Sequence, residues 1–462
     1  MNSSAKKENS RSLAEMMGIR EDEAAALLEA SVAVTFADDD RVAKDIATHT
    51  AALLSRTLSD VRLNDAQMRN VAVELVVGAI EPRYESPKIW LSVASGRATI
   101  TKSRLSSDAS NLHPIARLIA ACYACAAAID TLIGERLPYP TPETYVVDMC
   151  ELLGEDAPLL DKECDFSEAH LAGAGAIGNG FVLGLAQLPI HGKLYVVDDD
   201  NVSEGNLQRC ALFSQSDVGL KKAEVLAAAA ARTGSRVVYV PRTVRLQQLA
   251  ERKEGPWLKR LVVAVDSPRA RRHLQNEMPG EVFDASTTGA AEIVFHYHRQ
   301  PADAACLGCV YPSNPDEHAH ERHVAESLGV SIEDVSEIKI SQAAATKILA
   351  KYPDLERESV VGAPYDTLFK ALCSSEKLFT AEGRDVLTPF AFVSALAGVL
   401  LALEFFRRTH RGHSGLPNYW RISPWNNFMA RNRRTLPRNP DCEFCGVPVL
   451  RELIQQMWAN RV

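Results

Sequence analysis

Three glycines at a fixed spacing begin the stretch of the sequence that is richest in chemistry. Gly173, Gly175 and Gly178 form a G-x-G-x-x-G pattern directly after a short apolar run. Glycine lets the backbone turn sharply and approach a phosphate closely, and the N-terminus of a following helix favours negative charge. Asp198 ends the next apolar run, close to the spacing of roughly 20 residues at which an acidic side chain can bind a ribose hydroxyl. This pattern by itself indicates a nucleotide site, most often one for a nicotinamide cofactor.

Basic residues further along the chain change this interpretation toward ATP. Asn206 and Arg209 lie in the run NLQR, Lys222 lies in VGLKK, and Asp266 ends another apolar run with Arg271 just after it. Arginine and lysine can hold a triphosphate and neutralise charge as pyrophosphate leaves, and a carboxylate can hold Mg²⁺. A nicotinamide site would not need this pair of cations, so these residues favour a site for ATP and Mg²⁺.

Two pairs of cysteines have the spacing of a zinc site. Cys306 and Cys309 are separated by two residues, as are Cys442 and Cys445. This gap lets both thiolates of a pair reach one tetrahedral Zn²⁺ ion. Such an ion would tie the end of the predicted sheet to the C-terminal segment. Four reduced, buried thiols are the alternative interpretation.

Other cysteines and histidines are weaker candidates for chemistry. Cys122 and Cys125 lie in an alanine-rich run, and we expect them to be small core residues. Cys210 directly follows Arg209, which places it near the predicted ATP site, but we do not expect it to be a nucleophile. Residues 318–323, HAHERH, could present two histidines on one helix face, although a solvated helix is the favoured interpretation.

The apolar pattern predicts the elements that would position these side chains. From residue 167 to about 300, short apolar runs alternate with helix-like segments, which is typical of a doubly wound, Rossmann-like α/β sheet. Residues 31–37 also resemble a buried strand, but 38–41, DDDR, stand where a nucleotide loop would carry glycines. The small-residue-rich runs that begin at Pro114 and Pro389 echo each other. We therefore predict two lobes of related fold, the first a degenerate copy that no longer binds nucleotide. Two unrelated buried helices are the alternative.

Composition sets the broad class of protein. Of the 462 residues, 46% are hydrophobic and 24% charged, as is ordinary for a globular protein. The net charge of −8 gives no support to a nucleic-acid partner. We expect no apolar run of the roughly 18 residues that a membrane span needs, and the polar start of the chain is expected to be a loose tail and no signal peptide. We therefore expect a cytoplasmic protein without a membrane partner.

Taken in order, the motifs resemble those of the ThiF/MoeB superfamily, which includes the ubiquitin-activating enzymes. G-x-G-x-x-G, VDDD, NLQR, VGLKK and VDSPRARR agree with that superfamily in order and spacing. The resemblance covers residues 165–310 and 389–446. The four-cysteine arrangement also resembles the superfamily, where such zinc is structural. The sequence departs from the superfamily in one respect: its N-terminal segment lacks the Arg-rich entry motif that usually reaches the partner's ATP site.

The resemblance implies a role for each motif. Gly175 would approach the nucleotide, and Asp198 would bind the ribose. Arg209 and Lys222 would contact the phosphates, and Asp266 would hold Mg²⁺ near the reacting carboxylate. The whole set expected around ATP is Gly173, Gly175, Gly178, Asp198, Asp200, Asn206, Arg209, Lys222 and Asp266.

Three polar residues of this region have smaller roles. Asn206 would help to position the phosphates, and Asp200 lies close by without an assigned role. For Asp199 we favour a solvated turn.

Cys373 is the nucleophile that the resemblance implies. In ubiquitin-activating relatives, the interval between the zinc half-sites carries the cysteine that takes the activated chain as a thioester, and Cys373 lies in that interval. Lys370 and Lys377 could lower its pKa, because nearby positive charge favours a thiolate. A buried core cysteine is the alternative.

The resemblance implies ATP-dependent adenylation of the C-terminal glycine carboxylate of a ubiquitin-like protein, followed by a thioester on Cys373. A separate conjugating-enzyme-type partner would accept the activated chain. The resemblance alone suggests a bacterial ubiquitin-like conjugation system with an antiviral role. The chain would carry an active and an inactive half, and it could form a homodimer as well.

Three alternatives to this function stay open. A sulfur-carrier adenylyltransferase of thiamin, molybdopterin or thiolation pathways would not need Cys373. A scaffold would use ATP only structurally, and a nicotinamide oxidoreductase is disfavoured by Arg209 and Lys222.

The expected organisation has five segments. They are a flexible tail and helix (1–30), a degenerate adenylation-like lobe (31–150), an active ATP-binding domain (151–315), a mainly helical insertion that carries Cys373 (316–385), and a crossover helix with the C-terminal zinc-binding segment (386–462).

Overall fold

The computed structural model of the chain contains two compact units. Met1–Tyr311 together with Leu387–Val462 form the larger unit, and Pro312–Val386 form the smaller one. The structure describes residues 3–106, 111–300, 304–313, 315–337, 339–363, 365, 368–369, 372, 389–411, 416–427 and 432–459.

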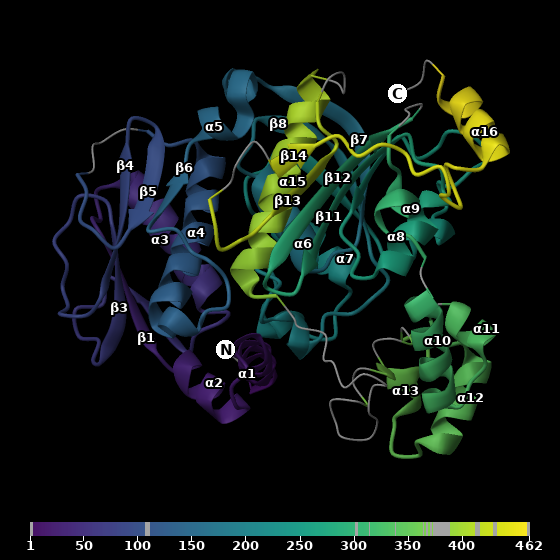
Figure 1. Cartoon of the computed structure of the whole chain (residues 1–462), viewed down its shortest axis with the longest axis horizontal. Coiled ribbons are helices and arrows are strands. Elements are labelled where there is room, and N and C mark those ends of the chain that lie inside the picture. Colours follow the sequence, from purple (N-terminus) through teal and green to yellow (C-terminus); the bar gives the residue numbers. More distant parts are fainter. Residues whose placement is uncertain are drawn as a thin grey trace. The chain divides into compact units, whose positions relative to one another are not determined.

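The first sheet of the larger unit has the strand order β2-β1-β3-β4-β5-β6 among the described residues. Its strands β1, β3, β4, β5 and β6 are labelled in Figure 1. The strands from β2 to β4 are parallel, and β5 and β6 run antiparallel to their neighbours. Branched apolar residues dominate β1, β3 and β4, as is usual for a buried parallel sheet. The strands are β1 (Ser31–Phe36), β2 (Asp60–Leu63), β3 (Val71–Val77), β4 (Lys88–Ala94), β5 (Arg97–Thr101) and β6 (Thr144–Val147).

The second sheet of the same unit has the order β14-β13-β12-β11-β10-β7-β8-β9 within the described ranges. The strands from β9 to β11 are parallel, and β12, β13 and β14 follow as antiparallel strands. They are β7 (Cys164–Ala172), β8 (Ile190–Val197), β9 (Val237–Arg242), β10 (Arg260–Val263), β11 (Glu281–Thr288), β12 (Glu292–Arg299), β13 (Tyr419–Ile422) and β14 (Arg433–Arg434). These two sheets with their connecting helices confirm the predicted α/β class.

The two sheets repeat one strand order. The series β8-β7-β10-β11-β12-β13 of the second sheet matches β2-β1-β3-β4-β5-β6 of the first in order and in relative direction. In both series, the chain order reverses beside the first strand of the lobe, which is β1 or β7. A ligand of a doubly wound sheet binds at this reversal, outside the carboxyl ends of the strands.

Helices connect the strands of the larger unit and cover its sheets. They are α1 (Ser3–Met17), α2 (Glu21–Leu28), α3 (Arg41–Leu54), α4 (Pro114–Ile133), α5 (Met149–Leu153), α6 (Ala176–Leu185), α7 (Lys222–Ala231), α8 (Pro268–Gln275), α9 (Leu307–Val310), α15 (Ala391–Arg411) and α16 (Pro448–Trp458).

Close packing of α15 on α6 fixes the helix that follows the glycine loop. A Cβ atom at Gly398 of α15 would lie 2.3 Å from the backbone nitrogen of Phe181 in α6. A Cβ atom at Gly180 of α6 would lie 2.8 Å from the carbonyl oxygen of Ala395. The two helices therefore touch through their backbones, and a side chain at either glycine would force them apart.

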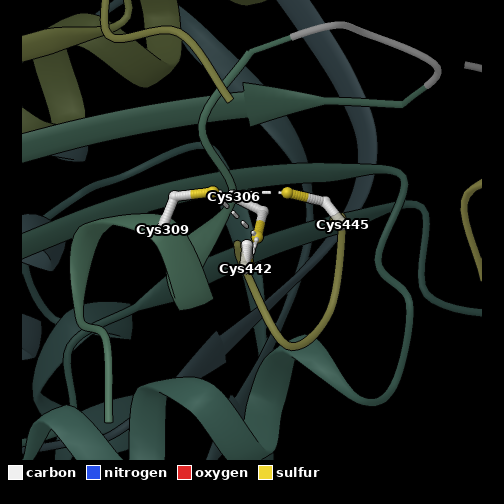
Figure 2. Close-up of side chains that lie close together, drawn as sticks. All are labelled: Cys306, Cys309, Cys442 and Cys445. Carbon is white, nitrogen blue, oxygen red and sulfur yellow. Dashed lines mark hydrogen bonds between the residues drawn. The ribbon is translucent and has the colours of Figure 1, made fainter. Parts of the chain in front are cut away.

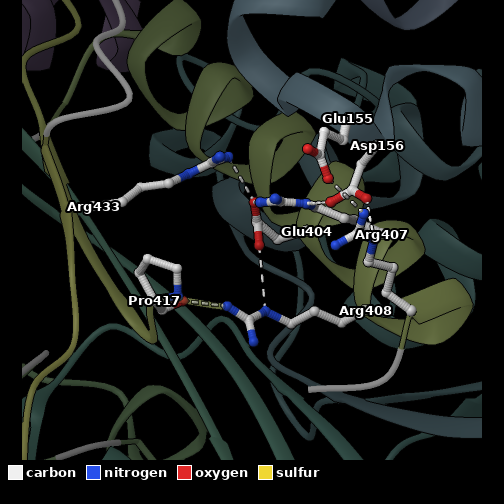
Figure 3. A network of polar contacts seen from close by, with 8 residues as sticks. Glu155, Asp156, Glu404, Arg407, Arg408, Pro417 and Arg433 are labelled. Atoms are coloured by element: carbon white, nitrogen blue, oxygen red, sulfur yellow. Dashed lines mark hydrogen bonds and ion pairs between the residues drawn. The ribbon is translucent and has the colours of Figure 1, made fainter. Parts of the chain in front are cut away.

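A buried charge network joins α15 to more distant segments (Figure 3). The carboxylate of Glu404 accepts hydrogen bonds from Arg433 (2.9 Å) and from Arg407 and Arg408 (3.3 Å each). Arg407 also pairs with Asp156 at 2.5 Å. Burial would raise the pKa of Glu404, but the arginines outweigh it and hold the pKa below its usual value. The carboxylate therefore stays charged inside the fold.

Two expectations about particular segments were wrong. The polar start of the chain, residues 1–12, was expected to be a loose tail, but residues 3–12 belong to helix α1 (Ser3–Met17), in which Leu13, Ala14 and Met16 form a face that packs into the core. By length and composition alone, the helix Pro114–Arg136 could also cross a membrane, which contradicts the expectation of no such run. The most apolar 18 residues of this helix are 78% buried inside the fold, as expected of a core helix.

The smaller unit is helical in its described residues and has its own hydrophobic core. Val324 and Leu328 pack with Ile348, Tyr365 and Phe369. Its helices are α10 (Pro315–Leu328), α11 (Ile332–Ser336), α12 (Gln342–Lys351) and α13 (Arg357–Val360). Cys373, the predicted nucleophile, lies outside the described residues of this unit, and so do Lys370 and Lys377.

Candidate nucleotide site and cysteine cluster

The glycine loop joins β7 to α6 at the reversal of the second sheet, and its three glycines differ in what surrounds them. Gly173 has a φ of +103°, and a Cβ atom there would lie 2.6 Å from the carbonyl oxygen of Ala264. A Cβ atom at Gly178 would lie 2.4 Å from the carbonyl oxygen of Gly173. Packing thus explains both of these glycines. A Cβ atom at Gly175 would meet nothing within 4 Å, so the backbone there faces open space at the N-terminus of α6.

Asp198 connects the end of β8 to the glycine loop. Its Oδ2 atom accepts a hydrogen bond from the backbone amide of Ala174 (2.7 Å), and its Oδ1 atom accepts one from the amide of Asp200 (2.9 Å). Burial raises the pKa of Asp198, while Lys222 opposes that rise. The carboxylate therefore stands beside the loop, as a ribose ligand would in this type of sheet.

Lys222 is the first residue of α7, and its side chain lies near Asp198 and Asp200. Its Nζ atom pairs with Oδ2 of Asp200 at 3.1 Å. Burial lowers its pKa, but Asp200 and Asp198 together outweigh the burial and raise the pKa above the ordinary value. The ammonium group is therefore charged and close to the glycine loop. Asp199, expected in a solvated turn, pairs with Arg245 at 3.5 Å.

Asn206 and Arg209 lie in the segment that follows β8. Asn206 ends the short 3₁₀ helix η3 (Glu204–Asn206), where its side-chain oxygen accepts a hydrogen bond from the amide of Ser203 at 3.0 Å. Arg209 is half-buried and donates a long hydrogen bond of 3.4 Å to the carbonyl of Gly205. Burial raises the pKa of the neighbouring Cys210 thiol, which disfavours a nucleophilic thiolate.

Asn179 ties this segment to the glycine loop, a link that we did not predict. It is fully buried in α6 and donates to the carbonyls of Ala174 (3.1 Å) and Gly175 (2.9 Å). Its oxygen accepts from the amide of Leu212 at 2.9 Å. The signal in the sequence is a polar residue on the apolar face of α6, because such a residue needs buried partners.

Asp266 is exposed just beyond the end of β10, next to the glycine loop. A second buried group that we did not predict supports this turn. Arg271 donates to the carbonyl of Val265 and forms an ion pair with Asp284, and both side chains are buried. Tyr311 donates to the other oxygen of Asp284 at 2.7 Å. These partners fix the peptide directly before Asp266.

The structure thus gathers the predicted nucleotide residues at one edge of the second sheet. The glycine loop, Asp198, Lys222 and the Arg209 segment are linked by the contacts above, and Asp266 follows the strand against which Gly173 packs. In the first sheet, the corresponding position follows β1. There the side chain of Asp40 caps α3 by accepting from the amide of Ala43 at 2.9 Å. A carboxylate at that helix N-terminus would oppose a phosphate.

The four predicted zinc ligands form a separate cluster (Figure 2). Their sulfur atoms all lie within 4.8 Å of one another. Cys306 lies 3.8 Å from Cys309 and 3.7 Å from Cys442, and Cys309 lies 3.2 Å from Cys445. Zn–S bonds of about 2.3 Å at tetrahedral angles would place sulfurs about 3.8 Å apart. The donor set therefore fits Zn²⁺, and the cluster joins α9 to the segment before α16.

The remaining histidine and cysteine candidates differ in their surroundings. Cys122 and Cys125 are fully buried in α4, and burial raises the pKa of both thiols. Two histidines of the run 318–323 contact an aromatic ring, since His320 and His323 lie edge-on to Phe369. The two cysteines are core residues, as expected, whereas His320 is exposed and His323 half-buried, which agrees with the expected solvated helix.

Two family models match this chain. Residues 150–444 match the model of the ThiF family, and residues 1–142 match the model of the E1 N-terminal domain.

Several curated proteins are similar to it in sequence. Uncharacterized protein y4jF of Sinorhizobium fredii is 28% identical over 363 residues, which are 74% of this chain and 69% of that protein. Ubiquitin-like modifier-activating enzyme 7 of Homo sapiens is 34% identical over 153 residues, 29% of this chain and 15% of that enzyme. Ubiquitin-activating enzyme E1 2 of Arabidopsis thaliana is 38% identical over 82 residues, 17% of this chain and 8% of that enzyme. The chain thus matches only a small part of either activating enzyme.

Among solved structures, E. coli MccB with ATP is 17% identical to this chain, with a TM-score of 0.37. That alignment covers 63% of this chain and 70% of MccB.

Proposed function

Because the chain belongs to the ThiF family, we propose that it is an E1-like adenylyltransferase that uses ATP to activate the C-terminal carboxylate of a protein or peptide. The observation that carries this proposal is the edge of the second sheet. Open backbone at Gly175, the carboxylates of Asp198 and Asp266, and the cations of Lys222 and Arg209 lie at or next to this edge, and they are the group types that bind a nucleotide, its phosphates and Mg²⁺.

Each side chain has a defined task in this reaction. Gly175 and the N-terminus of α6 leave room for phosphate oxygens, and Asp198 binds the ribose. Lys222 and Arg209 bind the triphosphate and neutralise the charge that grows on the leaving pyrophosphate. Asp266 would hold Mg²⁺, which lowers the charge of the phosphates when bound. A carboxylate oxygen of the substrate attacks the α-phosphorus, the bond to pyrophosphate breaks, and an acyl adenylate remains.

The finer proposal concerns the substrate and the next step. We propose that the substrate is a ubiquitin-like protein that ends in glycine, and that the thiolate of Cys373 attacks the acyl carbonyl, forms a thioester and releases AMP. A separate conjugating-enzyme-type protein then takes the acyl group by thiol exchange. The similarity to activating enzymes and the E1 N-terminal domain match support this proposal.

The four-cysteine cluster has a structural task in this proposal. Its four thiolates would hold a Zn²⁺ ion, which would tie the C-terminal segment to the sheet and would take no part in the reaction. A cytoplasmic location, a homodimer and a bacterial antiviral role stay predictions from the sequence.

An assay of AMP and pyrophosphate formation tests the function. The full chain is incubated with Mg²⁺, ATP and, in turn, purified ubiquitin or a purified sulfur-carrier protein of the thiamin or molybdopterin pathway. Formation of AMP and pyrophosphate that needs one of these proteins, and that stops when its C-terminal carboxylate is amidated, supports adenylation. No turnover with any of them, together with unchanged cellular function in Asp266→Ala, would favour a scaffold that uses ATP only structurally.

The second candidate function, a sulfur-carrier adenylyltransferase, differs in its need for a thioester. A reductant-sensitive adduct that is lost in Cys373→Ala and kept in Cys210→Ala supports the thioester step. Adenylation without such an adduct supports the sulfur-carrier function instead.

A further inference from the structure

Arg56 of the first lobe reaches into the second lobe beside the predicted phosphate site. It follows the end of α3, and its guanidinium donates to three backbone carbonyls of one segment. The acceptors are Leu207 (2.5 Å), Ala211 (3.0 Å) and Phe213 (2.8 Å). Arginine offers several donors in a fixed fork, so these bonds define the shape of the 207–213 segment as well as its place.

The 207–213 segment carries Arg209 between the points that Arg56 holds. The side chain of Arg209 has a long bond of 3.4 Å to Gly205, so the position of the guanidinium depends on the backbone on either side of it. The side-chain oxygen of Asn179 in α6 also accepts a hydrogen bond from the amide of Leu212 at 2.9 Å. The segment is thus held both by the helix of the glycine loop and by the first lobe.

A cavity adjoins the segment on the side of Arg56, although Leu207, Cys210 and Phe213 of the segment are themselves buried in the core. The cavity has a volume of about 250 Å³ and is lined by Ala5, Ser55, Arg56, Leu207, Phe213, Ser214 and Gln215. Residues beside a cavity have fewer contacts and more freedom to shift, so the hydrogen bonds of Arg56 carry a larger share of the ordering.

The first lobe also fixes Arg56 itself. Burial lowers the pKa of its guanidinium, yet arginine stays charged in proteins, and its charge strengthens each bond to a carbonyl. Asn9 of α1 is buried and donates to the carbonyl of Arg56 at 2.7 Å. Helix α1 in turn packs against η3, which begins the turn that contains Arg209.

We propose that Arg56 is a positioning residue that holds Arg209 in place for the triphosphate, so that a lobe without a nucleotide loop of its own still governs ATP binding. This inference rests on the proposed ATP site. It assigns to the first lobe a task in the chemistry of the second, carried by a residue that does not touch the substrate.

A double-mutant cycle on the full chain tests this coupling with Mg²⁺·ATP as the probe. Affinity is measured by calorimetry for the wild type, Arg56→Ala, Arg209→Ala and the double variant. We expect each single variant to bind ATP about tenfold more weakly, which corresponds to about 1.4 kcal/mol. Because Arg56 acts through Arg209, we expect the double variant to be no weaker than Arg209→Ala alone. Effects that simply multiply would overturn the proposal.

Two controls separate positioning from charge and from folding. Arg56→Lys keeps the charge and loses the fork, so we expect intermediate affinity, and full rescue would show that charge alone matters. Arg104→Ala removes an exposed arginine of the same lobe that pairs with Glu81, and it should leave affinity unchanged. Hydrogen exchange of residues 207–213 should accelerate in Arg56→Ala, and unchanged exchange would contradict the proposal.

The experiment distinguishes the inference from the function on which it rests. Absence of ATP binding in the wild type would refute the ATP site. Wild-type binding that Arg56→Ala retains in full would refute the role of Arg56 alone.

Discussion

Gly173 and Gly178 are required by close backbone packing, whereas Gly175 has open space around it. This difference separates glycines that the fold needs from a glycine that a ligand needs. The sequence shows the three residues as one motif and cannot separate them, because the separation depends on Ala264, which is distant in the chain.

We therefore expect Gly175→Ala to fold normally and to lose nucleotide affinity. The added methyl meets no protein atom within 4 Å, but it would occupy the space through which a phosphate approaches. Thermal unfolding should change little, and the affinity for Mg²⁺·ATP should fall about tenfold or more.

Gly178→Ala is the matched variant for this prediction. Its methyl would lie 2.4 Å from a backbone oxygen, so we expect it to destabilise the fold by at least about 1 kcal/mol, as overpacking commonly does. Unimpaired ATP binding in Gly175→Ala would contradict our interpretation of the loop.

At the scale of elements, α15 depends on the charge of Glu404. Glu404→Gln leaves three arginines around a neutral side chain, and breaking a buried ion network of this kind costs about 3–5 kcal/mol. Urea unfolding of this variant should show that loss. Arg421→Gln, which removes one partner of the exposed pair with Glu292, should cost less than about 1 kcal/mol.

The same network predicts a dependence of stability on pH. The folded pKa of Glu404 is lowered, so its stabilisation is present above the unfolded pKa of about 4.3 and is lost as the pH falls below it. As the pH falls below about 5, the wild type should lose stability more steeply than Glu404→Gln. Thermal unfolding at a series of pH values measures this difference. Identical pH profiles would contradict this account of the network.

The cysteine cluster makes a prediction about metal at the same scale. We expect the purified chain to contain about one Zn²⁺ ion, and we expect Cys442→Ser to lose it and to unfold at a lower temperature. Elemental analysis and thermal unfolding measure both effects. Cys150→Ser, which changes an exposed free cysteine, is the control and should keep the metal. Equal zinc content in the two variants would refute the site.

At the scale of the whole molecule, the class of the fold and most strands of the sheets could be predicted from apolar runs. Residues 31–37, for example, were expected as a buried strand, and Ser31–Phe36 form β1. Helix α1 was missed because its polar composition hides a narrow buried face, which only the surrounding core defines. The sequence also could not show that both sheets share one strand order, because strand order depends on pairing between distant segments.

The nucleotide residues could be listed from the sequence because they belong to short motifs. Their supports could not, since Asn179, Arg271 and Arg56 act through backbone carbonyls that no pattern of side chains reveals. The position of Cys373 stays a prediction, because that residue lies outside the described ranges.

The central claim is that one of the two related lobes binds ATP. Calorimetric titration of the full chain with Mg²⁺·ATP, and separately with NAD, tests it most directly. We predict one ATP per chain, no NAD binding, at least about tenfold weaker ATP binding in Lys222→Met, and wild-type affinity in the neighbouring variant Lys221→Met. Two ATP molecules per chain, binding of NAD in place of ATP, or wild-type affinity in Lys222→Met would contradict the account.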